Sequence, residues 1–330
     1  MKIGMLTSGG DCQSLNAAMR GVAKTLYNNT NDVEIYGFLD GYKGMITKNY
    51  KLMKEEDFSG ILTEGGTILG TSRTPFKYIN EPDEKGRDKV AGMIKTYKDL
   101  KLDCLVMLGG NGSHKTAALL SQKGLNVVTL PKTIDNDLCI TDHTPGYGSA
   151  AKYVASTLLE IGHDTSIYPI NSVTIVEIMG RDAGWLTGAS VLARNKYNHA
   201  PHLIYLPEVA FDEAQFIEDV REAIKKYNNV VIAVSEGIKN AEGKYISATS
   251  AVEDTFGHSQ LSGTGKCLEY IIKQNLQVKV RSVEINILQR CAAHMSSITD
   301  IGEAFRLGRH AVETALEGKS GVMVTAIRKA

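Results

Sequence analysis

The stretch LNVVTLPKTIDND, residues 125–137, carries the strongest indication of how this chain folds. Its first half, residues 125–130, is apolar and rich in valine, which is typical of a buried strand. Thr133, Asp135 and Asp137 follow that strand directly, with Lys132 beside them. Ligands of open α/β sheets bind at this end of the strands. A hydroxyl, two carboxylates and a cation there predict a site for proton transfer and phosphate binding.

Short apolar runs alternate with longer amphipathic runs along the rest of the chain. This alternation predicts an α/β protein with mostly parallel sheets flanked by helices. Strands are expected at residues 2–7, 34–39, 103–108, 125–130, 172–178, 203–206, 230–235, 283–288 and 322–326. Helices are expected at residues 16–27, 88–100, 115–121, 150–161, 213–227, 266–274 and 301–316.

The length of the chain predicts two Rossmann-like lobes rather than one. It has 330 residues, of which 43% are hydrophobic, so it can bury a large core. We expect residues 1–140 and about 290–316 to form one lobe, and residues 141–289 and about 317–330 to form the other. The active site is expected in the cleft between them.

Composition argues against several classes of partner. Lys plus Arg and Asp plus Glu number 37 each, so the chain has no net field to attract nucleic acid or a membrane. No run approaches the ~20 apolar residues needed to span a bilayer, and the first apolar run is too short for a signal peptide. The five cysteines are an odd number and contain no CxxC pair, which favours reduced thiols and a cytoplasmic location.

Two glycine loops follow strands and precede helices. The first is TSGGD, residues 7–11, and the second is LGGNGS, residues 108–113. Glycines let the backbone approach a ligand, and a helix N-terminus offers free N–H groups to an anion. Neither loop matches the P-loop or the GxGxxG pattern, and a single Gly-Gly turn is usually only a tight turn. Two such loops together with the acidic segment favour a phosphate site.

Five further positions could supply charge to such a site. Arg73 lies in the loop GTSRTP, residues 70–75, and Arg181 follows Met179 and Gly180 in a glycine turn after a strand. Glu236 ends another strand, and Arg281 and Arg290 lie on or near the last well-defined strand. Arginine suits bidentate phosphate binding, although each arginine alone would also fit a surface salt bridge.

These motifs, in this order, resemble the phosphofructokinase family over residues 2 to about 324. The resemblance implies a kinase that transfers a phosphoryl group to the 1-hydroxyl of fructose 6-phosphate with Mg²⁺. It implies a donor lobe at residues 1–140 and a sugar-phosphate lobe at residues 141–289. It also implies a homodimer or homotetramer whose sugar site is often completed by a neighbouring subunit.

The resemblance also implies roles for individual residues. Asp135 matches the general base, with Thr133, Asp137, Arg181 and Arg73 in the catalytic group. The residues that match donor-binding positions are Gly10, Tyr42, Arg73, Gly109, Gly110, Asn111, Gly112, Ser113 and Lys132. The residues that match sugar-phosphate-binding positions are Thr133, Asp135, Asp137, Met179, Gly180, Arg181, Glu236, Arg281 and Arg290.

Two positions bear on whether ATP or pyrophosphate is the donor. Pyrophosphate-dependent members that resemble this chain usually carry Asp where Gly112 stands, and that side chain would fill the space of the nucleotide α-phosphate. Gly112 leaves this space open and favours ATP. Lys132 is typical of pyrophosphate enzymes, but some ATP-dependent members combine the same Gly and Lys. We therefore expect ATP, with pyrophosphate as the alternative.

The chain departs from the family pattern at several sites, which leaves further alternatives open. Asn111 stands where the family usually has a magnesium-linked Asp, and Ser14 and Ile287 also differ. These departures allow a ligand-binding subunit without turnover, or a kinase of another sugar phosphate. Arg20 and Lys24 lie where some bacterial members bind effectors, but allosteric control stays undecided.

Overall fold

The computed structural model describes residues 1–72, 74–246 and 261–329. The chain divides into two compact units. The first unit consists of Met1–Ile134, Leu138–Ser149 and Arg290–Ala330, and the second of Asp135–Asp137 and Ala150–Gln289.

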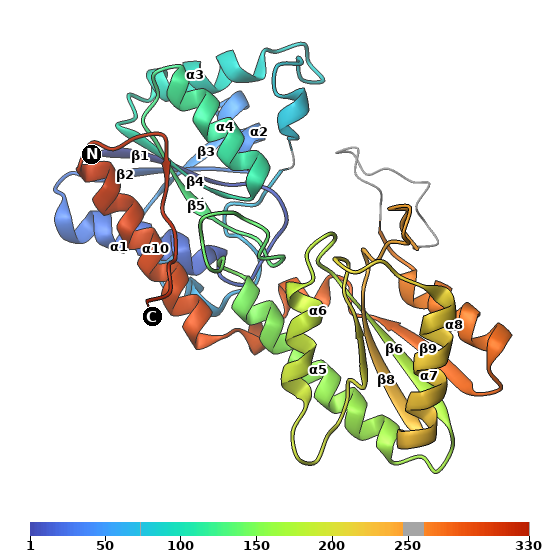
Figure 1. Ribbon diagram of the computed structural model, residues 1–330. Helices are drawn as coiled ribbons and strands as arrows, with labels where there is room; N and C mark the ends of the chain where they lie inside the picture. The colour runs from blue at the N-terminus through green and yellow to red at the C-terminus, as the bar shows by residue number, and fades with distance from the viewer. Residues whose placement is uncertain (73, 247–260, 330) are drawn as a thin grey trace. The chain divides into compact units, whose positions relative to one another are not determined.

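The first unit is built on a six-stranded sheet with the strand order β10-β5-β4-β1-β2-β3. Neighbouring strands run parallel except β2 and β3, which are antiparallel. Helices α1 and α10 lie side by side on one face, and α2, α3 and α4 cover the other (Figure 1). The strands are β1 (Lys2–Thr7), β2 (Glu34–Phe38), β3 (Tyr50–Met53), β4 (Cys104–Gly109), β5 (Val127–Pro131) and β10 (Val322–Met323). The helices are α1 (Leu15–Asn29), α2 (Tyr42–Thr47), α3 (Lys89–Asp99), α4 (Asn111–Gln122) and α10 (Ile298–Leu316).

The second unit is built on a parallel four-stranded sheet with the order β7-β8-β6-β9. Apolar side chains of α7 and α8 pack with one face of this sheet into a core. The strands are β6 (Ser172–Ile178), β7 (Leu203–Tyr205), β8 (Asn229–Ser235) and β9 (Lys279–Glu284). The helices are α5 (Tyr147–Ser166), α6 (Trp185–Ala189), α7 (Glu213–Tyr227) and α8 (Thr264–Asn275); α9 (Leu288–Cys291) spans the boundary between the two units in sequence.

The buried strands explain why the sequence specifies two parallel sheets. All residues of β4 and β5 are buried, as are all but the first of β6 and β8. Parallel strands covered on both faces have such nearly continuous apolar sequences. The predicted fold class, α/β with mostly parallel sheets flanked by helices, is confirmed.

Three predicted boundaries need correction. The strand expected at residues 283–288 lies at Lys279–Glu284, because the edge strand β9 is largely exposed and its apolar pattern is weak. The helix expected at residues 115–121 already begins at Asn111. Residues 317–330 belong to the first unit rather than the second, because β10 pairs in parallel with β5.

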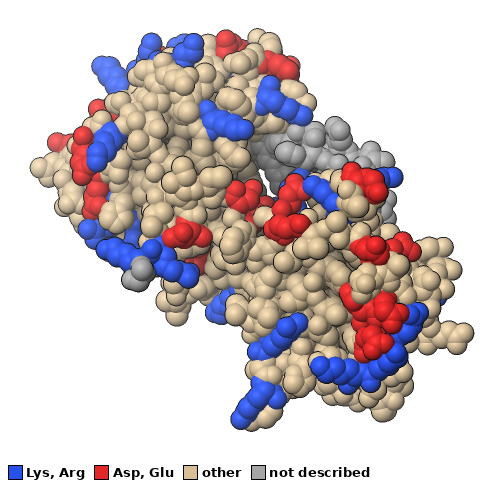
Figure 2. All heavy atoms as spheres, in the orientation of Figure 1, with Lys and Arg blue, Asp and Glu red and all other residues tan. Residues whose placement is uncertain are grey.

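Positive and negative side chains are interspersed on the face seen in Figure 2. This pattern agrees with the formal net charge of zero. None of the helices in the described part of the chain is both long and apolar enough to cross a membrane.

Candidate functional site

Both glycine loops and Lys132 lie at the carboxyl ends of three neighbouring strands of the first unit. Thr7 of β1 pairs with Leu108 of β4, and Gly109 pairs with Pro131 of β5. The backbone N–H of Lys132 donates to the oxygen of Gly109 at 3.0 Å. Its Nζ donates to the oxygen of Gly10 at 2.6 Å, although the residue is only 5% exposed. The structure therefore brings together two loops that are 100 residues apart in sequence.

The second loop forms the N-terminus of α4. Gly110 is the N-cap and Asn111 the first helical residue. A Cβ on Gly109 would lie 2.2 Å from the Ser113 Oγ, so this position has no room for a side chain. A Cβ on Gly112 would meet nothing within 4 Å. The free N–H groups of this helix end, next to open space at Gly112, are suited to binding an anion.

Tyr42 contributes to this loop through the core. Its ring is 1% exposed, and its hydroxyl donates to the oxygen of Ser113 at 3.5 Å. Tyr42 therefore supports the α4 loop from the interior and presents no exposed ring surface.

The loop that carries Arg73 runs beside the first glycine loop. Ser72 pairs with Ser8, and the Thr71 hydroxyl donates to the oxygen of Gly9 at 2.8 Å. Arg73 itself lies outside the described residues.

Asp11 is a candidate that the sequence contained but to which no role was assigned. Its Oδ1 is buried and has no hydrogen-bond partner among the described residues. Burial raises the pKa of the Asp11 carboxyl, and the nearby charges of Arg290 and Lys132 oppose this rise. The feature of the sequence that marks Asp11 is its position directly after Gly9-Gly10. Arg290 thus lies near the first glycine loop, within the first unit.

The acidic segment after β5 alternates between buried and accessible side chains. Ile134 and Asn136 are buried, Asp135 is half-buried and Asp137 is exposed. Thr133 is half-buried, and its backbone oxygen accepts a hydrogen bond from the Thr144 hydroxyl at 2.6 Å. Thr133 belongs to the first unit, whereas Asp135 and Asp137 belong to the second.

Asp135, Glu236 and Arg181 interact electrostatically in the second unit. Glu236 Oε1 accepts from the backbone N–H groups of Gly180 and Arg181 at 3.3 and 3.1 Å. The pKa of Glu236 is raised to about 7, chiefly by burial and also by the negative charge of Asp135, while the amides and Arg181 oppose the shift. A carboxyl that titrates near neutrality beside a second acid and an arginine is typical of a functional site.

A tight backbone contact holds the Arg181 turn against Glu236. Arg181 has a positive φ of 50°, and a Cβ on Gly237 would lie 1.7 Å from the Arg181 oxygen. Only glycine at position 237 allows this approach. Met179, half-buried, precedes the same turn.

Glu177 is a second buried acid next to this group, and the sequence analysis gave it no role. Its Oε2 accepts from the Gly265 N–H at the start of α8, at 2.7 Å. The pKa of Glu177 is raised to about 7, chiefly by burial and also by the charges of Glu284 and Glu236. Its place in the strand before the glycine turn, four residues ahead of Arg181, was the only signal in the sequence.

Arg281 does not join the other candidates. Arg281 pairs with Thr174 in the register of β6 and β9, and Glu284 pairs with Glu177. Side chains alternate between the two faces of a sheet along a strand, so Arg281 and Glu284 lie on opposite faces. Arg281 therefore lies on the opposite face of the sheet from Glu177. Its guanidinium binds Asp164 on α5 at 2.8 Å and the Thr174 hydroxyl at 3.2 Å. Within one chain, Arg281 is therefore a partner of α5.

Two further predicted features can be placed. Arg20 and Lys24, the effector candidates, line a groove of about 430 Å³ between α1 and residues 55–59.

Among the described residues, no group of three or more His, Cys, Asp or Glu side chains could hold a metal ion. Asn111 is exposed at the start of α4 and offers a single neutral oxygen.

Comparison with known proteins agrees with this arrangement. The profile of the phosphofructokinase family matches residues 2–315. An ATP-dependent 6-phosphofructokinase of Spirochaeta thermophila is 38% identical over 97% of this chain and 86% of its own length. A pyrophosphate–fructose 6-phosphate 1-phosphotransferase of Halomonas elongata is 34% identical over 96% of this chain and 77% of its own length.

A solved structure shows the same fold. The pyrophosphate-dependent phosphofructokinase of Marinobacter aquaeolei superposes with a TM-score of 0.86 at 28% identity, covering 100% of this chain and 79% of the other. The match extends over nearly the whole chain in both sequence and structure. The chain belongs to the phosphofructokinase family.

Proposed function

We propose that this protein is an ATP-dependent 6-phosphofructokinase that transfers the γ-phosphoryl group of ATP to the 1-hydroxyl of fructose 6-phosphate. The observation that carries the proposal is the electrostatic group of Asp135, Glu236 and Arg181 in the second unit. It combines a half-buried carboxylate able to accept a proton with a cation able to offset phosphoryl charge.

In the proposed reaction, Asp135 accepts the proton of the 1-hydroxyl as its oxygen attacks the γ-phosphorus. The new O–P bond forms while the bond from the γ-phosphorus to its bridging oxygen breaks, and ADP leaves. Phosphoryl transfer depends on an oriented nucleophile and on dispersed charge more than on covalent catalysis. Arg181 and Arg73 would offset this charge, and Thr133 and Asp137 would complete the catalytic group.

The donor would be held by the first unit. Gly10, the loop from Gly109 to Ser113 and Lys132 supply backbone N–H groups and one cation at the strand ends. The two substrates would be held by different units, with Met179, Gly180, Arg181 and Glu236 on the sugar side. Glu236 is then the contact to the sugar hydroxyls.

Magnesium is part of the proposal, with Asn111 as its candidate ligand. The exposed side-chain oxygen of Asn111 fits an ion that keeps several waters and is bound mainly by the donor phosphates. When bound, Mg²⁺ would neutralise charge on the phosphoryl group.

The open space at Gly112 favours ATP over pyrophosphate as the donor, because nothing within 4 Å of this position would exclude a nucleotide α-phosphate. Pyrophosphate is the second candidate. Lys132 favours it, since this buried cation beside Gly10 could hold the charge of a small donor.

We also propose that the protein acts as a homodimer or homotetramer in the cytoplasm. Arg281 lies on the face of its sheet opposite to Glu177, which would suit a contribution to the sugar-phosphate site of a neighbouring copy. Arg290 would remain the 6-phosphate cation within its own chain. The five cysteines are unpaired, as is usual in a reducing compartment.

The Asp135→Asn variant tests the proposed reaction. Formation of fructose 1,6-bisphosphate from ATP and fructose 6-phosphate should fall by ~10²–10⁴ in kcat, because the base is lost while the shape is kept. Asp99→Asn is the control, since Asp99 pairs with Lys48 and Lys95 at the surface. An unchanged rate in Asp135→Asn would rule out Asp135 as the base. Wild-type protein that binds both substrates without product would support a binding subunit instead.

A further inference from the structure

Residues 144–146, here called the bracing segment, connect the acidic segment to the first glycine loop. The Thr144 hydroxyl donates to the Thr133 oxygen at 2.6 Å, and Gly146 pairs with Thr133 in a parallel bridge. On its other side, the Cys12 thiol donates to the oxygen of Pro145 at 3.7 Å. The position of the bracing segment therefore influences both Thr133 and the end of the first loop.

Gly146 has little freedom to move. Its φ is 103°, and an added Cβ would lie 2.7 Å from the Cys12 Sγ. The backbone of Gly146 thus packs directly against Cys12, which is 1% exposed. A displacement of Gly146 would be transmitted to its neighbours rather than absorbed by empty space.

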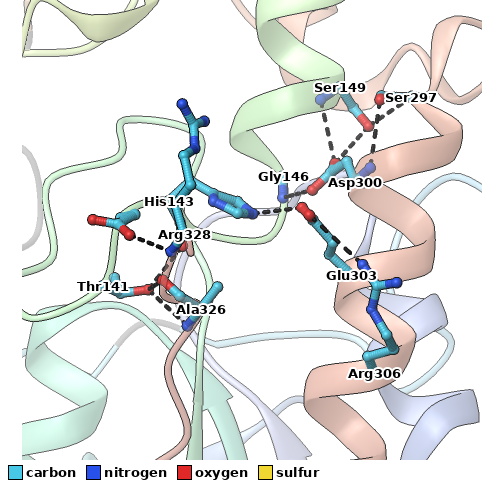
Figure 3. Close-up of polar contacts among 11 residues, drawn as sticks. Thr141, His143, Gly146, Ser149, Ser297, Asp300, Glu303, Arg306, Ala326 and Arg328 are labelled. Atoms are coloured by element: carbon cyan, nitrogen blue, oxygen red, sulfur yellow. Dashed lines mark hydrogen bonds and ion pairs between the residues drawn. The ribbon is translucent and has the colours of Figure 1, made fainter. Parts of the chain in front are cut away.

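The carboxylate of Asp300 holds Gly146 in place from α10 (Figure 3). Its Oδ1 accepts from the Gly146 N–H at 3.0 Å. Its Oδ2 accepts from the N–H and the hydroxyl of Ser149 at 3.3 and 2.6 Å. Asp300 is only 3% exposed, so these bonds replace the water that its charge would otherwise bind.

We propose that Asp300 is a positioning residue for catalysis, acting through the bracing segment on Thr133 and hence on Asp135, two residues further along. The inference rests on the proposed function, because it assigns Asp300 to the same reaction. Asp300 touches neither substrate. It fixes the backbone from which the proton acceptor extends, and small displacements of such a group lower the rate markedly.

Two substitutions of Asp300 test this role. In Asp300→Ala, kcat should fall at least tenfold while KM for ATP and fructose 6-phosphate stays within about threefold. Asp300→Asn should lose less, because its amide oxygen can still accept from Gly146. Rates are measured well below the melting temperature of each variant.

Glu303 provides a matched control one turn along the same helix. It binds His143 at 2.5 Å, in the loop that leads to the bracing segment, whereas the Gly146 N–H donates to Asp300 (Figure 3). Glu303→Gln should retain kcat within about twofold. A purely structural role for Asp300 would lower the melting temperature and leave kcat unchanged, which would overturn the proposal.

Hydrogen exchange gives a readout that does not depend on turnover. Backbone amides of residues 133–146 should exchange faster in Asp300→Ala than in the wild type, and at wild-type rates in Glu303→Gln. Unchanged exchange in Asp300→Ala would refute the positioning role even if the protein proved inactive with every donor. Lack of wild-type turnover together with faster exchange would refute the proposed function and leave the bracing contact established.

Discussion

Gly112 is a position at which one side chain should change the preference for the phosphoryl donor. Gly112→Asp places a carboxylate in the open space beside the α4 N-terminus. We expect kcat/KM for ATP to fall at least tenfold, because the new charge and volume oppose the nucleotide α-phosphate. Initial rates with ATP and with pyrophosphate measure the change.

Gly112→Ala is the control for this substitution, because it adds a methyl group without charge. Its preference for ATP should remain close to that of the wild type. Equal ATP kinetics in Gly112→Asp and wild type would show that the space at position 112 does not receive the nucleotide.

The buried carboxyl of Glu177 should make stability depend on pH. Its pKa is raised to about 7 in the folded protein, above the ordinary value of 4.5. Between these values the folded state binds more protons than the unfolded state, so the free energy of unfolding decreases as pH rises through this window. Glu177→Gln removes this contribution and retains an oxygen for the Gly265 N–H.

Urea unfolding at pH 5 and pH 8 measures this effect. The decrease in the free energy of unfolding between the two pH values should be smaller in Glu177→Gln than in the wild type, by on the order of 1–3 kcal/mol. Glu242→Gln, at an exposed turn, should match the wild type. If the free energy of unfolding decreased between pH 5 and pH 8 as much in Glu177→Gln as in the wild type, this carboxyl would already be ionised at pH 5.

Helices α1 and α10 pack backbone to backbone, and glycine makes this possible. A Cβ on Gly308 would lie 2.1 Å from the Ala18 oxygen. Gly308→Ala should therefore lower the free energy of unfolding by about 1–3 kcal/mol, through overpacking. Chemical denaturation of the variant and the wild type measures the difference.

Gly302 offers a control in the same helix. A Cβ there meets nothing within 4 Å, so Gly302→Ala should stabilise the protein by about 0.5–1 kcal/mol through helix propensity. If Gly308→Ala and Gly302→Ala changed the free energy of unfolding by the same amount, the close contact between α1 and α10 would not be the cause of the effect at Gly308.

Elements with uniform burial could be predicted from the sequence, whereas exposed or long-range elements could not. The bounds of β1, β6 and α7 agree with the expected ranges at both ends. The edge strand β9 was misplaced because its apolar pattern is weak. The antiparallel β3 is half exposed and was missed. The pairing of β10 with β5 joins residues almost 200 positions apart, and local pattern carries no signal for it.

The residues of the candidate site also differ in whether a local sequence pattern marks them. Glycine loops and acids after strands are local motifs, so the sequence indicated Gly109 and Asp135. The contacts of Arg281 with α5 and of Asp300 with Gly146 depend on register and tertiary packing. Neither can be read from residue type or spacing alone.

The chain as a whole combines two mostly parallel sheets whose strand ends carry different chemistry. The first unit presents glycine loops and a helix N-terminus suited to anions, and the second presents acids beside an arginine. With zero formal net charge, the positive charge that meets a phosphate must come from these local groups. This division of roles between the units supports phosphoryl transfer between two separate substrates as the function.

The most direct test of the central claim is the initial rate of the wild-type protein with each donor. Fructose 6-phosphate and Mg²⁺ are supplied with ATP or with pyrophosphate, and fructose 1,6-bisphosphate is measured. We expect turnover with ATP and a kcat/KM that exceeds the value for pyrophosphate. A larger value with pyrophosphate would contradict the assignment of the donor, and no product with either donor, from folded protein, would contradict the assignment as a kinase.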